Sequence, residues 1–234
     1  MWVCYFMEFR FYPDPEGTCY YLKFGSRKAP FLAFICLFMF LSVPLKMIFV
    51  TSSGWAFDPQ DLERFDKSGV CLDCDLTGVN FFGRDLTGLD LRGTDLAGAD
   101  LRMSNLTGTD LRGAYLAGAD FRGADLSKAD FFIADAQMAN FSRTNLFDVD
   151  FSSAKLTRAQ FDGAKVVGSN FYSADVRGAG FDMTVLNDCY FFEADLTDAN
   201  LGSAVLRNND FGGAILCRTV LPGGVESSGC EVDR

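Results

Sequence analysis

The sequence reads Ala119-Asp120-Phe121-Arg122-Gly123-Ala124-Asp125-Leu126 near its middle, and this five-residue unit recurs in one register from Leu76 to Leu216. Of the 29 units, 28 have a large apolar residue at the centre and one has Ala136, and the residue two positions before the centre is usually small, most often Ala. Asp or Asn comes directly before the centre in 20 units. A period of five matches neither an amphipathic helix nor an alternating strand, and therefore indicates a stacked-repeat protein.

Five residues are too few to bury an apolar face alone, so several units must form one coil that packs on the next. The pattern Ala-(Asp/Asn)-Leu-X-X resembles the pentapeptide-repeat family over about 60% of the chain. The similarity is to bacterial and cyanobacterial members, and it implies an exported or membrane-anchored protein. The resemblance implies an all-β fold, a right-handed quadrilateral β-helix with four repeats per coil. On that basis we expect about seven coils in residues 71–221.

A coil of 20 residues predicts that side chains 20 positions apart form columns. From Phe121 onward, Phe occupies the centre of nearly every second unit, which is half a coil. We therefore expect two columns of Phe on opposite walls, stacked as a core ladder and not as a cofactor site. No cofactor is expected.

The N-terminal part of the chain differs from the repeats. Residues 1–28 are aromatic and irregular, and they precede an apolar run that begins at Ala29 and ends at Val50. Basic residues before this run and the small residues Gly54 and Ala56 after it are typical of a secretory signal in residues 29–56, with cleavage after Ala56. A retained single-pass membrane anchor is the alternative, and the third interpretation is a segment with neither role.

Residues 57–70 have the pattern of a short helix. Asp58 is a favourable N-cap, Pro59 suits the first helical position, and Gly69 can end the helix. Because the end coil of a solenoid exposes apolar core and unpaired strand edges, we expect this helix to cap the N-terminal end. Residues 222–234 would then form a closing loop and tail.

Five cysteines follow Ala56. Cys189 occupies an inward small-residue position and should be a buried thiol. The Cys71-Leu72-Asp73-Cys74 motif is a structural disulfide or a pair of unpaired thiols, with a redox-active pair as the alternative; zinc would need further ligands, and no metal site is expected. The resemblance extends to both ends of the repeat, and it implies a disulfide between Cys217 and Cys230 that fits an exported protein.

The positions on either side of each centre should face solvent. The Asp or Asn side chains there are expected to hydrogen-bond nearby backbone N–H groups. On the wall of Asp90 and Asp110, Arg92 and Arg112 should offset part of the acidic charge. On the opposite wall the same role is expected of Arg102 and Arg122 toward Asp100 and Asp120.

One set of outward positions is unusual because it is aromatic. Phe132, Tyr172, Tyr190 and Phe192 fall on one wall in the C-terminal half of the repeat. We call these four residues the aromatic face. They predict a surface for a protein partner or for self-association. The alternative is that they are scattered surface aromatics in a chain with 25 Phe.

The composition excludes several classes of function. The chain has a net charge of −10 and no His, which disfavours nucleic-acid binding and removes the commonest general base. We expect no enzyme, but a structural or protein-interaction solenoid exported to the periplasm or a thylakoid lumen, with a single-pass membrane protein as the alternative. An acidic DNA mimic that binds gyrase, as some members of the family do, and a redox protein using Cys71 and Cys74 are the competing hypotheses.

Overall fold

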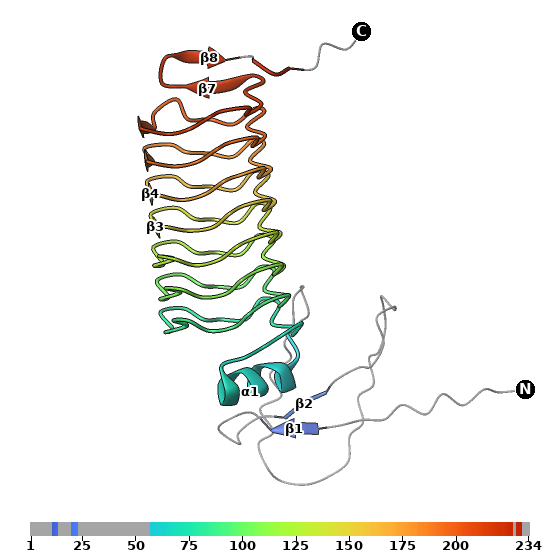
Figure 1. The fold of residues 1–234 in the computed structure, drawn as a ribbon. Coiled ribbons are helices and arrows are strands. Elements are labelled where there is room, and N and C mark those ends of the chain that lie inside the picture. The colour runs from blue at the N-terminus through green and yellow to red at the C-terminus, as the bar shows by residue number, and fades with distance from the viewer. Residues whose placement is uncertain (1–10, 14–19, 23–56, 227, 231–234) are drawn as a thin grey trace, which may run out of the picture. The chain divides into compact units, whose positions relative to one another are not determined.

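The computed structural model describes residues 11–13, 20–22, 57–226 and 228–230, and the chain divides into two units, Met1–Ser53 and Gly54–Arg234 (Figure 1). In the first unit, β1 (Phe11–Pro13) pairs antiparallel with β2 (Tyr20–Leu22), inside the stretch that the sequence suggests is irregular. The apolar run that begins at Ala29, and with it the signal or anchor hypothesis, lies outside the described residues. Within the described residues, no helix has the length and apolarity needed to span a bilayer.

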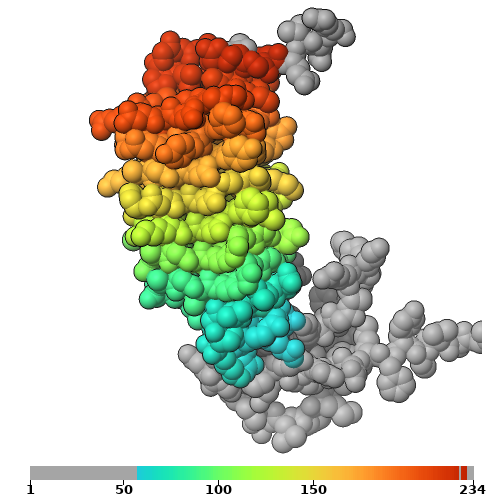
Figure 2. Space-filling model, in the orientation of Figure 1, coloured from blue at the N-terminus to red at the C-terminus, as the bar shows by residue number. Residues whose placement is uncertain are grey.

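The second unit is a stack of coils. Parallel bridges join residues 20 apart, for example Asp90 to Asp110, Asp110 to Asp130 and Asp130 to Asp150. Since one repeat has five residues, four repeats complete one turn. Figure 2 shows the successive coils as bands of side chains stacked one on another.

Most of the described repeats contribute a single bridged residue and a turn, and one wall carries a parallel sheet of three-residue strands. There, β3 (Asn145–Phe147), β4 (Lys165–Val167), β5 (Val185–Asn187) and β6 (Val205–Arg207) form a parallel sheet in that order. Four of the eight outward positions in these strands carry Val or Phe, namely Phe147, Val167, Val185 and Val205, and such residues favour extended backbone.

Each wall ends in a corner, formed by the second residue after the centre. At most corners the next N–H donates to the carbonyl of the centre residue, as from Ala124 to Phe121 over 2.9 Å. The corner residue has positive φ, and at Gly123 this angle is 70°. Glycine adopts a positive φ without steric cost. Met183 has a φ of 52°, where its Cβ atom lies too close to the following carbonyl oxygen, so this conformation costs free energy.

The interior is filled by the centre residues. The rings of Phe121 and Phe141 stack at 4.9 Å between centroids and 7° between planes, and the same contact repeats along the column. A second column begins at Phe131, whose ring meets that of Phe121 edge-on at 5.9 Å. The two expected Phe columns are therefore present, and they also contact each other across the interior.

Inside the stack, buried hydroxyl side chains form hydrogen bonds between consecutive coils. Thr109 Oγ1 donates to Leu86 O over 2.8 Å, and Thr184 Oγ1 donates to Phe161 O over 2.7 Å. Each bond spans 23 residues and occurs where Thr replaces the usual inward Ala. Because the hydroxyls are fully paired, they occupy the core without leaving an unsatisfied polar group.

Different elements lie at the two ends of the stack. At the start, α1 (Pro59–Ser68) has Asp58 as N-cap and Gly69 as C-cap, and its buried Phe65 contacts the ring of Phe81 at 5.3 Å. At the other end, β7 (Thr219–Leu221) and β8 (Gly224–Glu226) form an antiparallel hairpin. The chain then returns, and Leu216 N donates to Ser228 O over 2.9 Å.

Candidate interaction surface

The aromatic face consists of side chains that the repeat holds outward. Phe132, Tyr172 and Phe192 each follow a fully buried Phe centre, and Tyr190 precedes one. Their exposed fractions are 42%, 44%, 43% and 53%. Because each neighbouring centre is locked in the core, the backbone that carries these rings is fixed by the stack.

Two of the four rings are in direct contact. Tyr172 and Phe192 stack at 6.1 Å between centroids with 8° between their planes. On its other side, Phe192 lies over Gly212, where a Cβ atom would come within 2.9 Å of the ring. Because Gly212 has no side chain, the ring of Phe192 can pack directly over its backbone.

The structure adds two residues to this surface that the pattern of aromatic side chains in the sequence does not include. Ile133 is 54% exposed and directly follows Phe132. Ser152 occupies the outward position between Phe132 and Tyr172, one coil from each, and is buried. The spacing of 20 residues in the sequence places Ser152 in the same column as Phe132 and Tyr172, and it places Ile133 at the adjoining corner.

Carboxylates line the aromatic face. Asp150 Oδ1 accepts hydrogen bonds from the backbone N and the hydroxyl of Ser152. Burial raises the pKa of Asp130, and the negative charge of Asp150 raises it further. Arg112 Nε lies 3.5 Å from Asp130 and offsets part of this effect.

The N-terminal half of the same wall has a different composition, because arginine takes the outward positions. Arg112 forms a fork with Asp110, with Nε to Oδ1 at 2.8 Å and Nη2 to Oδ2 at 2.5 Å. Arg92 and Asp90 form the same fork. The side-chain hydrogen bond from Arg112 holds the pKa of Asp110 below its usual range. The expected charge compensation is thus present, as it is at Arg102 and Arg122 on another wall.

The Cys71 and Cys74 side chains lie under α1. They are joined by a disulfide, and both residues are 1% exposed. Arg64 Nη2, from α1, is 2.9 Å from Cys74 Sγ. An electron-donating protein would have to displace α1 to reach these sulfurs.

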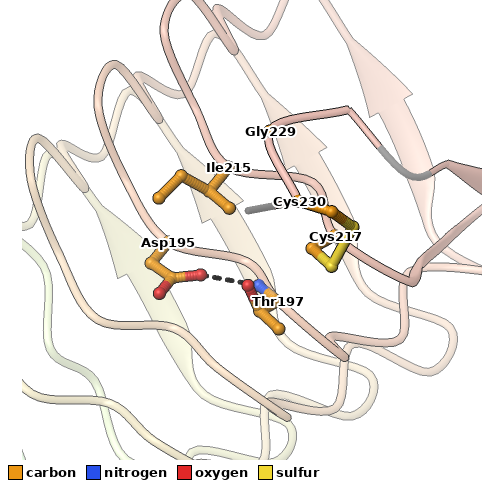
Figure 3. A pocket seen from close by; sticks show the side chains of 6 residues that line it. All are labelled: Asp195, Thr197, Ile215, Cys217, Gly229 and Cys230. Carbon is orange, nitrogen blue, oxygen red and sulfur yellow. Dashed lines mark hydrogen bonds between the residues drawn. A yellow bond between two sulfur atoms is a disulfide. The ribbon is translucent and has the colours of Figure 1, made fainter. Parts of the chain in front are cut away.

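A second disulfide joins Cys217 to Cys230 and closes the return of the tail onto the last coil. Figure 3 shows a hollow beside it, lined by Asp195, Thr197, Ile215, Gly229 and the disulfide itself. The carboxylate of Asp195 accepts a hydrogen bond from Thr197 N over 2.9 Å. No further polar side chain converges on this hollow among its lining residues.

Cys189 is a free thiol in the core, and burial raises its pKa to about 11. It is therefore held as a thiol at neutral pH, as the inward position predicts. The described residues contain no group of three or more potential metal ligands.

A family model of pentapeptide repeats matches the chain in 8 copies, over residues 74–113, 109–146, 144–181 and 184–222. The chain belongs to the pentapeptide-repeat family. Members of this family form right-handed β-helices, and the parallel bridges of this pentapeptide-repeat protein agree with that fold.

Three solved structures illustrate the range of similar proteins. A pentapeptide repeat protein from the Arabidopsis thaliana thylakoid lumen is 33% identical over 42% of this chain and 68% of its own, with a TM-score of 0.41. HetL, a protein involved in heterocyst differentiation regulation in the cyanobacterium Nostoc sp. strain PCC 7120, is 21% identical over 72% of this chain and 99% of its own, with a TM-score of 0.38.

The third is QnrB1, a plasmid-mediated fluoroquinolone resistance protein. It is 20% identical over 56% of this chain and 80% of its own, with a TM-score of 0.27. None of the curated proteins matches the chain significantly.

Proposed function

We propose that this pentapeptide-repeat protein is a non-catalytic interaction solenoid, a stack of about seven coils capped by α1, which binds a protein partner or a second copy through its aromatic face. The observation that carries the proposal is the stacked and half-exposed pair Tyr172 and Phe192, with Phe132 and Tyr190 on the same wall. Aromatic side chains held on a rigid surface are enriched at the energetic centres of protein interfaces.

The physical advantage of this surface is its low entropic cost. The buried Phe centres next to the exposed rings fix the backbone, and the stack of Tyr172 on Phe192 restricts both side chains before any partner arrives. Binding therefore orders few additional groups, and more of the apolar burial contributes to affinity.

We place the site of action in an exported compartment, the periplasm or a thylakoid lumen. The disulfides Cys71–Cys74 and Cys217–Cys230 support this assignment, because such bonds persist in oxidising compartments and are rare in a reducing cytosol. The signal-like pattern of residues 29–56 supports it independently.

The alternative of an acidic DNA mimic has less support. Such a mimic needs columns of carboxylates available to a DNA-binding protein. Here Asp90 and Asp110 are each held in a fork by an arginine of the same repeat, as are Asp100 and Asp120. In the N-terminal half of these two walls, the acidic charge of these four residues is thus neutralised within the protein.

The test is a double substitution of the aromatic face, Phe132→Ser with Phe192→Ser. A matched control is Phe82→Ser with Phe147→Ser, since these rings are 56% and 43% exposed on other walls. We expect the first variant alone to lose its partner in affinity capture from the native host, or its self-association in sedimentation. Equal behaviour of the two variants would refute the proposal.

A further inference from the structure

The two disulfides of the described residues differ in their access to solvent. Cys71 and Cys74 are each 1% exposed and lie under α1, where their sulfurs contact α1 atoms. Cys230 is partly exposed, and together with Cys217 it lines the hollow of Figure 3. Exposed disulfides are the more easily reduced and the more often regulatory ones. A reductant in solution therefore reaches the Cys217–Cys230 bond first.

Arg218 is placed to assist the reduction of this bond. Its Nη1 lies 3.6 Å from Cys217 Sγ. Its Nε and Nη2 form a fork with Asp198, both at 2.6 Å, and this fork holds the guanidinium in place. A cation beside sulfur stabilises the thiolate, and disulfide exchange is faster when the leaving sulfur is the more stable thiolate. Cys217 is therefore the leaving group, and the more exposed Cys230 is the sulfur that is attacked.

The disulfide is the main attachment of residues 228–230 to the last coil. Among the described residues, one backbone hydrogen bond joins this segment to the coil beneath it, from Leu216 N to Ser228 O over 2.9 Å. Gly229 packs against Ile215, whose Cα would lie 3.3 Å from a Cβ at the glycine. Ordering three residues costs more free energy than one hydrogen bond returns. Once the sulfur–sulfur bond is broken, the segment should therefore leave the coil.

Release of this segment would open one edge of the stack. In the earlier coils of this wall, the centre N–H donates to the next coil, as from Leu196 N to Ile215 O over 2.9 Å. For Leu216, in the last coil, Ser228 O is the acceptor. Without it, the Leu216 N–H is unpaired and Ile215 loses the cover of Gly229. Such an unpaired edge is a surface on which a further strand can pair.

We propose that the Cys217–Cys230 disulfide is a redox switch that opens and closes the C-terminal end of the solenoid, and that its reductant is a dithiol protein of the thioredoxin class. A thiolate of the reductant attacks Cys230 Sγ, the bond to Cys217 breaks, and Cys217 Sγ leaves with the bonding electrons and takes up a proton. The second thiolate of the reductant attacks the reductant's own sulfur in the mixed disulfide, and Cys230 leaves and is protonated. The chain gains two electrons and two protons, and the reductant becomes a disulfide. The switch acts at the end of the stack and does not rest on the aromatic face.

Differential alkylation of the full-length chain tests the order of reduction. The oxidised chain is treated with a limiting amount of reduced thioredoxin, free thiols are alkylated, and peptide mass mapping identifies the modified cysteines. We expect Cys217 and Cys230 to be labelled at least about tenfold faster than Cys71 and Cys74. Equal labelling of the two pairs, or earlier labelling of Cys71 and Cys74, would refute the switch.

A pair of variants tests the part of Arg218. Arg218→Gln should slow the labelling of Cys217 and Cys230 by about fivefold, because the leaving thiolate loses its cation. The matched control is Arg122→Gln, which also removes a fork with an aspartate but lies on another wall, and which should leave the rate unchanged. Equal rates in the two variants would overturn the assignment of Cys217 as the leaving group.

Amide hydrogen exchange tests the opening itself. In the oxidised chain, the amides of Leu216 and Leu196 should both be protected. After selective reduction, or in the double variant Cys217→Ser with Cys230→Ser, the Leu216 amide should exchange at least about tenfold faster. The Leu196 amide should not change, because its acceptor, Ile215 O, stays within the stack. Continued protection of Leu216 after reduction would show that the disulfide does not control this end of the solenoid.

Discussion

Replacing Phe161 by Ala should be among the most destabilising single changes in this protein. The ring is fully buried and stacks on Phe141 at 5.0 Å and on Phe181 at 4.9 Å, and it also meets Phe151 and Phe171 edge-on. Truncating a buried Phe costs about 3–5 kcal/mol, and four ring partners place Phe161→Ala near the upper limit. Phe161→Leu keeps most of the volume and should cost only about 1–2 kcal/mol.

Phe211→Ala provides the comparison within the same ladder. Phe211 is half-buried in the last coil and stacks on Phe191 alone, at 5.0 Å, among the described rings. Its truncation should cost about 2 kcal/mol, less than half the cost at Phe161. Guanidinium unfolding followed by circular dichroism gives each free energy of unfolding. Equal costs at the two positions, or a cost below about 2 kcal/mol at Phe161, would refute the ladder as the main source of stability.

Three further predictions concern the corners, the charged wall and the tail. Met183→Gly should stabilise the chain by about 1 kcal/mol by relieving a positive φ, and Gly88→Ala should destabilise it by a similar amount, both measured by thermal unfolding. The lowered pKa of Asp110 stabilises the fold at neutral pH, and the raised pKa of Asp130 opposes it there. Asp110→Asn should therefore lower the free energy of unfolding and Asp130→Asn should raise it, and both differences should shrink as the pH falls from about 7 to about 2 in urea titrations. Cys217→Ser opens a disulfide with a sequence separation of 13 and should cost about 3 kcal/mol; an unchanged melting temperature would show that the tail contributes no stability.

The arrangement of the coils could be predicted because the repeat has a constant length. Once four units of five residues complete a coil, residues 20 apart must be neighbours, and Phe121 must stack on Phe141 whatever the details of the turns. The same regularity placed Arg112 beside Asp110 and put the four residues of the aromatic face on one wall.

Contacts outside the repeat register could not be predicted in this way. Arg84 lies over the rings of Phe65 and Phe81, at 5.3 and 4.9 Å, but Phe65 belongs to α1 and has no column partner in the sequence. Likewise, the bond from Thr109 to Leu86 depends on a side-chain rotamer that a spacing of 23 residues does not reveal.

The Ser152 position was missed for another reason. A pattern of exposed aromatic residues does not include a serine, and the burial of Ser152 depends on the side chains packed around it. The absence of an arginine there is visible only by comparison with Arg92 and Arg112 at the equivalent positions.

Site-specific photo-crosslinking in the native host tests the interaction face most directly. A photoreactive amino acid replaces Phe132 in one strain and Phe82, on another wall, in a second strain. We expect a discrete crosslinked adduct from position 132, lost when Phe192→Ser is added, and none from position 82. No adduct from position 132, or the same adducts from both positions, would contradict it.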